Sequence, residues 1–195
     1  YDEGIQQIGT LNVSVYPTLS EHEVEYIIND SGIKAILVGN TFLFKKILKI
    51  APNCRQLDYI IPAFPEFSKV TLPEDLNAEV ISLEEILSNR GHITETQINQ
   101  ISTLRNALRP SDVSSLIYTS GTTGTPKGAM LTHGNFVENV KVCLQQIPVI
   151  DETETFLSFL PLSHVFERTA TYHVCCAQGC KIAFAQCLEL VGKNM

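Results

Sequence analysis

The polar stretch YTSGTTGTPKGAM, residues 118–130, gathers side chains that suit anion binding. Its glycines allow backbone N–H groups to converge on a ligand, because they tolerate unusual dihedrals and leave room for close approach. The hydroxyls of its Ser and Thr residues are short donors, and Lys127 supplies a positive charge for phosphate. The composition of this stretch therefore predicts a phosphate-binding loop.

Two familiar phosphate-binding patterns do not fit this loop. In the P-loop pattern the second glycine would fall at Pro126, and Gly128 stands after Lys127 where Ser or Thr is required. In the dinucleotide pattern the glycines open a helix, but Gly121 and Gly124 are followed by strand-like residues. A plain surface hairpin is the simple alternative, and it is disfavoured because such turns need only about two to five residues. The failed P-loop match also disfavours an ATPase that releases ADP.

Strands and helices alternate around the loop. The expected strands are 112–119, 128–133, 155–160 and 181–185, and the expected helices are 134–147 and 163–179. This alternation predicts an α/β fold with a mainly parallel sheet.

The residues before the loop show the same alternation of strands and helices. Ser20, Glu23 and Gly32 are start and stop signals for a helix over 20–32. Further strands are expected at 10–17, 34–39 and 57–62, together with a helix at 41–50 and a loop at 62–77. A strand and a capped helix are expected over 79–91, with Ser82 as the cap of the helix and Gly91 as its stop. Residues 92–110 are polar and weakly helical, which is typical of a connector.

Composition narrows the class of protein. The chain has 195 residues, 44% hydrophobic and 18% charged, with a net charge of −7, and this acidity argues against a nucleic-acid partner. No stretch reaches the length of a membrane span and no export signal is visible, so we expect a cytoplasmic protein with reduced thiols. His173, Cys176 and Cys180 would share a helix face, but their spacing is wrong for a metal site, and small buried residues are the simpler interpretation.

Two motifs resemble a known family. The stretch YTSGTTGTPKG resembles the phosphate-binding signature of the AMP-forming adenylating enzymes, which include acyl-CoA synthetases, firefly luciferase and peptide-synthetase adenylation domains. The segment LPLSHVFER, residues 160–168, is similar to the next motif of that family and is most like long-chain fatty acyl-CoA synthetases. The upstream segment 13–38 also resembles that group, so the likeness spans nearly the whole chain.

The resemblance implies a two-step reaction. A fatty carboxylate attacks the α-phosphate of Mg-ATP to give acyl-AMP and pyrophosphate, and the thiol of coenzyme A then displaces AMP. By motif match, residues 120–125 would hold the β- and γ-phosphates, Thr119 would lie near Mg²⁺, and Lys127 would anchor the loop or neutralise phosphate. The implied nucleotide-binding residues are Thr119, Ser120, Gly121, Thr122, Thr123, Gly124, Thr125 and Lys127.

His164 matches the family position that faces the reacting carboxylate and the α-phosphate, so the resemblance implies a catalytic role for it beside Lys127. A histidine that only satisfies a helix start is the structural alternative. Glu167 and Arg168 either pair with each other or cover the acyl entrance. Some long-chain members gate the fatty-acid tunnel with a tryptophan near this point, but this chain has no Trp and carries Arg168 there.

The family also implies groups with no counterpart here: an acidic Mg²⁺ ligand, an adenine-stacking aromatic, a ribose-binding Asp, a hinge and a C-terminal Lys. We therefore expect residues 1–195 to be part of an N-terminal AMP-binding domain, divided into 1–91, a connector at 92–110, and 111–195. The leading hypothesis is a fragment of a long-chain fatty acid–CoA ligase, inactive alone, that uses fatty acid, ATP and coenzyme A. Another adenylating ligase and a non-catalytic nucleotide-binding relative are the alternatives. Chain length of the acid, oligomeric state and peripheral membrane contact of the full protein stay open.

Overall fold

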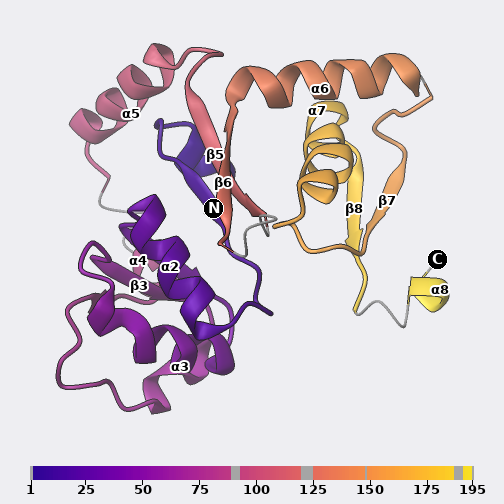
Figure 1. Cartoon of the computed structure of the whole chain (residues 1–195). Helices are drawn as coiled ribbons and strands as arrows, with labels where there is room; N and C mark the ends of the chain where they lie inside the picture. The colour runs from indigo at the N-terminus through magenta and orange to yellow at the C-terminus, as the bar shows by residue number, and fades with distance from the viewer. Residues whose placement is uncertain (1, 89–92, 120–124, 148, 187–190, 195) are drawn as a thin grey trace. The chain divides into compact units, whose positions relative to one another are not determined.

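The computed structural model describes residues 2–88, 93–119, 125–147, 149–186 and 191–194 (Figure 1). The chain divides into two compact units. The first unit comprises Tyr1–Tyr16, Ala107–Thr119 and Ala129–Met195, and the second comprises Pro17–Asn106 and Ser120–Gly128. The first unit thus combines residues from before and after the predicted connector.

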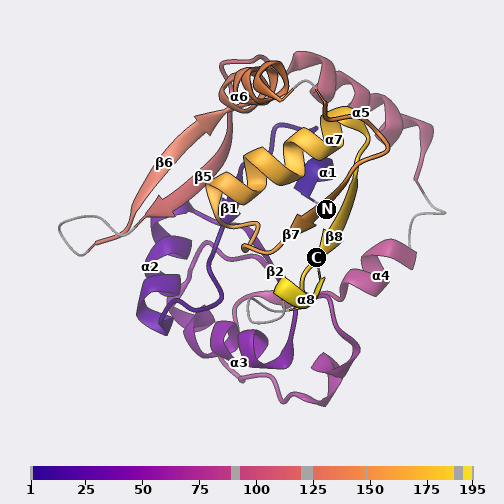
Figure 2. The ribbon, with the colours of Figure 1, turned by 90° about the vertical axis from the view of Figure 1, so that its right-hand side faces the viewer.

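The second unit is built on a small parallel sheet. Its strands are β2 (Ala35–Val38), β3 (Tyr59–Pro62) and β4 (Glu79–Val80), paired in that order with Ala35 opposite Tyr59. The helical elements of this unit are α2 (Glu21–Ser31), α3 (Thr41–Ile50), η1 (Ala51–Asn53), η2 (Pro65–Lys69), α4 (Leu83–Ser88) and α5 (Glu95–Ala107). Figure 2 shows α2 and α3 lying next to each other.

Local signals fix the ends of α2 and α3. The Ser20 hydroxyl accepts from the Glu23 N–H, and the Glu23 carboxylate accepts from the Ser20 N–H, which completes the expected capping box. Gly32 ends α2 at φ 66°, a left-handed conformation that favours glycine. Asn40 caps α3, which occupies the predicted range 41–50. The sequence therefore determined both helices locally.

An apolar core holds the second unit together. Ile27 and Ile28 of α2, Phe44 of α3 and Ile60 of β3 are fully buried. Burial of each such side chain stabilises the fold by about 1.5–3 kcal/mol. The ring of Phe44 meets the rings of Phe64 and Phe67 edge-on, with centroids 5.9 and 6.3 Å away. Because Phe67 belongs to η2, the segment expected to be a plain loop contains a short helix that packs on the core.

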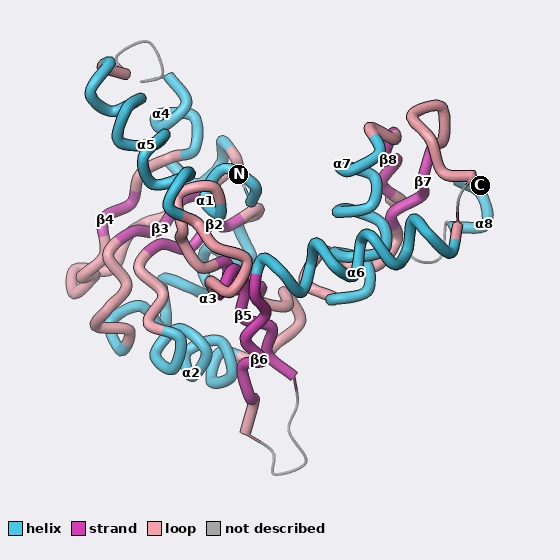
Figure 3. The backbone as a smooth tube through the Cα atoms, turned by 90° about the horizontal axis from the view of Figure 1, so that it is seen from above, coloured by secondary structure: helices cyan, strands magenta, loops and turns pink. Residues whose placement is uncertain are grey.

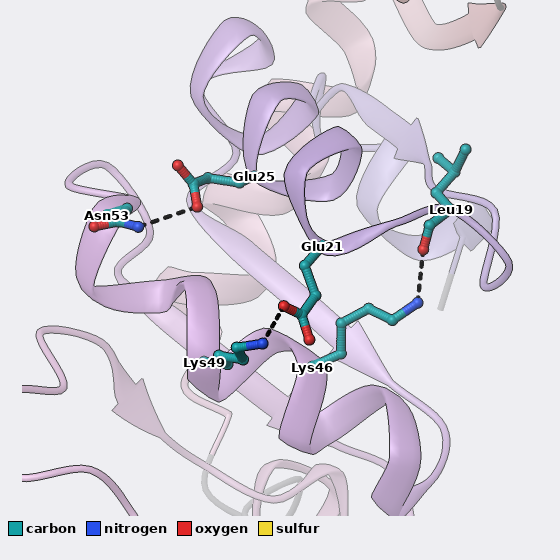
Figure 4. Close-up of polar contacts among 6 residues, drawn as sticks. All are labelled: Leu19, Glu21, Glu25, Lys46, Lys49 and Asn53. Carbon is teal, nitrogen blue, oxygen red and sulfur yellow. Dashed lines mark hydrogen bonds and ion pairs between the residues drawn. The ribbon is translucent and has the colours of Figure 1, made fainter.

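Polar contacts tie α2 and its preceding turn to α3 (Figure 4). Lys46 donates to the main-chain oxygens of Pro17 and Leu19, and Lys49 pairs with Glu21. The Asn53 amide, just after α3, donates to Glu25 over 3.1 Å. These contacts occupy the ammonium groups of both Lys46 and Lys49.

The first unit contains two further sheets. One has the order β1 (Asn12–Ser14), β5 (Val113–Thr119), β6 (Lys127–Thr132), and the other pairs β7 (Thr155–Ser158) with β8 (Lys181–Phe184). The remaining elements are α1 (Asp2–Gln6), α6 (His133–Gln146), η4 (Glu167–His173), α7 (Val174–Gln178) and α8 (Val191–Asn194). β5 and β6 lie side by side in Figure 3. The α/β prediction is confirmed and the pairs β1–β5 and β7–β8 are parallel, but the strands form three small sheets.

Two predicted segments differ in detail. The connector contains a regular helix, α5, which has no buried residue and is therefore a solvated helix. The helix expected over 163–179 contains η4, whose backbone follows π-helical rather than α-helical hydrogen bonding. A π-helical segment places one extra residue in a turn and often occurs at functional sites. Gly91, the expected stop of the preceding helix, lies outside the described residues.

Candidate functional site

Strand β5 brings Thr119 to the candidate site. Ser114, Ser115, Ile117 and Tyr118 are buried, whereas Thr119 at the end of the strand is exposed. The strand is therefore anchored in the interior and presents its last hydroxyl at the surface, where the polar loop begins.

β6 continues the chain beyond the loop. The structure confirms that the loop links two strands, because β5 and β6 are neighbours in one sheet. Thr125 and Lys127 are exposed, and Lys127 has no hydrogen-bond or ion-pair partner within the described part of the chain. Its ammonium group is thus available for an anion. The remaining predicted loop residues, Ser120, Gly121, Thr122, Thr123 and Gly124, lie outside the described residues.

His164 stands at the start of the helical run that leads into η4. Its main-chain N–H donates to Pro161 O over 2.8 Å, and its carbonyl accepts from the N–H of Arg168 over 3.0 Å. The ring Nδ1 accepts from the N–H of Phe166 over 3.2 Å. In the neutral ring the proton therefore sits on Nε2. His164 is exposed, so it satisfies a helix start and also carries a donor that a ligand can reach.

Glu167 and Arg168 are both buried, with 1% and 3% of their surface exposed. Arg168 Nη1 donates to the Ser14 hydroxyl over 3.0 Å, and the Ser14 hydroxyl donates to Asn12 Oδ1 over 3.2 Å. Oε1 of Glu167 has no hydrogen-bond partner among the residues that the structure describes. Arg168 therefore connects the segment 160–168 to β1. The ion pair with Glu167 considered from the sequence is not among the described contacts.

A layer of buried polar groups surrounds this connection, and the sequence analysis missed it. The Ser114 hydroxyl donates to Gln6 Oε1, and the Ser115 hydroxyl donates to the carbonyl of Asn12, each over 3.2 Å. The one available signal was the pair of serines within an otherwise apolar strand. Buried polar groups of this kind require partners, so β1, β5 and η4 specify one another.

His173 of η4 and the cysteines of α7 have partners other than the buried polar layer. His173 packs on the rings of Phe136 and Tyr172, and its Nδ1 lies 3.5 Å from Glu3. Cys175 is buried, which raises the pKa of its thiol to about 11, whereas Cys176 is exposed. Across the described residues, no group of three or more His, Cys, Asp or Glu side chains is arranged to hold a metal ion.

Comparisons with known proteins agree on one family. The family model of the AMP-binding enzyme matches residues 2–191. The chain is 32% identical over 185 residues to a long-chain-fatty-acid–CoA ligase of Homo sapiens, covering 94% of this chain and 26% of the relative. It is also 32% identical over 177 residues to a chloroplastic long-chain-fatty-acid–[acyl-carrier-protein] ligase of Arabidopsis thaliana, covering 89% of this chain and 24% of the relative.

The fold is shared with solved structures. The adenylation domain of a carboxylate reductase from Mycobacterium chelonae superposes with a TM-score of 0.66 at 19% identity, covering 94% of this chain and 29% of that one. The chain spans about a quarter of the length of the two curated relatives. The chain belongs to the AMP-binding enzyme family.

Proposed function

We propose that the full protein is an AMP-forming ligase that activates a long-chain fatty carboxylate with ATP and transfers the acyl group to coenzyme A. The support is family membership together with relatives named as long-chain-fatty-acid ligases. The observation that carries the proposal is that β5 and β6, which are neighbours in one sheet, flank the polar stretch in the sequence. Residues 1–195 are proposed to form part of the N-terminal AMP-binding domain, inactive without the rest of the protein.

In the first proposed step a carboxylate oxygen attacks the α-phosphorus of ATP. The bond between that phosphorus and the bridging oxygen breaks, and its electron pair leaves with pyrophosphate. Negative charge grows on the departing oxygens, so fixed N–H donors and a cation lower the barrier. Residues 120–125 would supply the donors and Lys127, which is free of partners in the described structure, would supply the cation.

His164 is proposed to orient the carboxylate in this step. Its Nδ1 is held by Phe166, and its Nε2–H is the donor left for a substrate oxygen. Orientation of this kind lowers the barrier by fixing the geometry of attack before reaction. In the second step the thiol of coenzyme A attacks the acyl carbon, loses its proton, and expels AMP.

The nucleotide is proposed to bind as its Mg²⁺ complex. Thr119 fits a place near this ion, because its exposed hydroxyl at the end of β5 is the hard oxygen ligand that Mg²⁺ prefers. When bound, the ion draws negative charge from the phosphates.

The acceptor has a second candidate. One relative is named as a ligase for acyl-carrier protein, so a protein-bound thiol is an alternative to coenzyme A. In both acceptors a thiol sulfur attacks the acyl carbon. The acceptors differ in the molecule that carries this thiol. A direct comparison of the two acceptors with preformed acyl-AMP would separate them.

The proposed function is tested by pyrophosphate exchange. Labelled pyrophosphate should enter ATP only when the full protein is given a carboxylate, and a panel of acids should favour long unbranched chains. Exchange with amino acids or aryl acids alone would move the protein to another branch of the family. No exchange with any acid, in a folded protein that binds ATP, would favour a non-catalytic nucleotide-binding relative.

A further inference from the structure

Two cysteines flank the tight turn between α7 and β8 in the first unit (Figure 1). Cys175 lies in α7, and Cys180 stands directly before β8. Gly179 makes the turn, and its φ of 72° is the left-handed conformation that ends many helices. The N–H of Cys180 donates to the carbonyl oxygen of Cys175 over 3.0 Å, which is the 6→1 hydrogen bond of a Schellman turn. The turn therefore folds Cys180 back onto Cys175.

This backbone hydrogen bond brings the two cysteines within reach of a disulfide. The amide nitrogen is bonded to the Cα of Cys180, and the carbonyl oxygen is two bonds from the Cα of Cys175. The two Cα atoms therefore lie within the roughly 7 Å that a disulfide can span. Side chains at these two positions of a Schellman turn often contact each other. Here the thiols of Cys175 and Cys180 are hydrogen-bonded to each other, so a bond between the sulfurs requires little movement of the backbone.

The two thiols differ in their surroundings. Cys175 is fully buried, and desolvation, reinforced by the neighbouring Cys180, raises the pKa of its thiol to about 11. Cys180 is partly exposed, and its thiol donates to the carbonyl oxygen of Asp151 over 3.0 Å. Both cysteines are free thiols in the structure. A dissolved oxidant therefore meets the sulfur of Cys180 first, with the sulfur of Cys175 beside it.

We propose that Cys175 and Cys180 form a reversible disulfide when the protein is exposed to hydrogen peroxide. The thiolate sulfur of Cys180 attacks one peroxide oxygen, the O–O bond breaks, and the departing hydroxide takes up a proton, which leaves a sulfenic acid and water. The sulfur of Cys175 then attacks the sulfur of Cys180 and loses its proton, and the hydroxyl of the sulfenic acid leaves as a second water. Two electrons pass from sulfur to peroxide oxygen in the whole reaction.

The disulfide changes how the turn before β7 is held. In the reduced protein the Cys180 thiol donates to Asp151, whereas the sulfur of a disulfide has no proton to donate. The N–H of Lys181 still donates to the carbonyl oxygen of Glu154 after oxidation, so the turn 151–154 loses one of its two contacts with this segment. Disulfide formation is independent of the proposed ligase reaction, because it requires neither ATP nor an acyl acceptor.

The test treats the full protein with hydrogen peroxide and maps its cysteines by mass spectrometry. Remaining thiols are blocked in denaturant with N-ethylmaleimide, and disulfides are then reduced and labelled with iodoacetamide. In the tryptic peptide 169–181 we expect the iodoacetamide label on Cys175 and Cys180 and the maleimide on Cys176. Dithiothreitol should reverse the oxidation. The amides of 152–154 should exchange with solvent roughly 2- to 10-fold faster in the oxidised protein, the effect of losing one ordinary hydrogen bond.

Three serine variants assign the roles of the sulfurs. In Cys175→Ser the sulfenic acid of Cys180 should persist and react with dimedone, and in Cys180→Ser no disulfide should form. The matched control is Cys176→Ser, which removes the exposed neighbour and should form the disulfide at an unchanged rate. The melting temperature checks the folding of each variant.

Three results would overturn the proposal. The first is that Cys175 and Cys180 both stay thiols in the treated protein. The second is that Cys180 pairs with Cys176, and the third is that Cys180 is oxidised to a sulfinic acid while Cys175 stays a thiol. Unchanged exchange at 152–154 in the disulfide-bonded protein would contradict the loosening of the turn.

Discussion

The N–H of Phe166 donates to Nδ1 of His164 over 3.2 Å, so the neutral imidazole carries its proton on Nε2. The hydrogen bond assigns two jobs to the two ring nitrogens. Nδ1 secures the start of the helical run, and Nε2–H is the donor proposed to meet a ligand. The structural and catalytic interpretations of His164 can therefore be separated by substitution.

His164→Asn should separate them. An asparagine oxygen can still accept from the N–H of Phe166, so we expect stability to be kept, but no donor remains where Nε2–H stands. The rate of acyl-AMP formation should fall about 10²-fold, by analogy with the loss of other transition-state donors. His164→Ala should show the same kinetic loss together with a cost of about 1 kcal/mol in stability.

Single-turnover kinetics times acyl-AMP formation and thioester formation separately. Thioester formation from supplied acyl-AMP should be less affected than acyl-AMP formation in both variants. If His164→Asn retains the full rate of the first step, the histidine serves the helix start alone.

Lys127→Ala should slow acyl-AMP formation by about 10²-fold or more, because the cation is lost where charge develops on pyrophosphate. Lys127→Arg should be milder, since the charge is kept while the geometry differs. Lys141→Ala is the matched control, an exposed lysine paired with Glu138, and should leave the rate unchanged. Equal loss in both half-reactions with a lowered melting temperature would instead assign Lys127 to the fold.

Ser14→Ala should destabilise the first unit. The Ser14 hydroxyl accepts from buried Arg168, and a hydrogen bond to a charged group contributes about 1.5–3 kcal/mol. Ser163→Ala is the control, because the buried Ser163 hydroxyl has no partner in the described part of the chain and its removal should cost little. Urea unfolding measures both. Similar midpoints for the two variants would show that the Arg168 contact contributes nothing to stability.

The buried thiols should be protected from alkylation. Desolvation raises the pKa of Cys54 and of Cys175 to about 11, so little thiolate forms near pH 8. Exposed Cys176 should react first, and mass spectrometry of labelled peptides reads the order. Since the folded pKa lies above the unfolded value of 9.0, these thiols favour the folded state below pH 9 and lose that contribution as pH rises toward 11. Rapid labelling of Cys54 in folded protein would contradict this.

Local signals made part of the fold predictable. The range of α3 and the capping box of α2 depend on neighbouring residues, and the strands on both sides of the loop depend on short apolar runs. The contact of Ser14 with Arg168 could not be foreseen, because it joins residues 154 positions apart. The π-helical backbone of η4 was not predicted either, because the apolar spacing of residues 163–179 indicates only a helix and not its type of hydrogen bonding.

The candidate site residues were predicted from motif chemistry rather than from shape. Thr119, Thr125, Lys127 and His164 occupy strand ends, the loop and a helix start, as expected. What the sequence could not reveal is which nitrogen of His164 is engaged within the protein, because the partner of Nδ1 is a main-chain N–H. Residue type predicts which groups can act, whereas hydrogen bonding decides which atoms remain available.

In the proposed reaction a fatty carboxylate attacks the α-phosphorus of ATP. The most direct test gives the full protein a long-chain fatty acid with ¹⁸O in both carboxylate oxygens, together with ATP and coenzyme A, and analyses the phosphorus products by mass spectrometry. The account predicts one ¹⁸O atom in AMP and none in pyrophosphate, because thioester formation leaves the attacking oxygen on the α-phosphorus. Appearance of ¹⁸O in inorganic phosphate with release of ADP would contradict it.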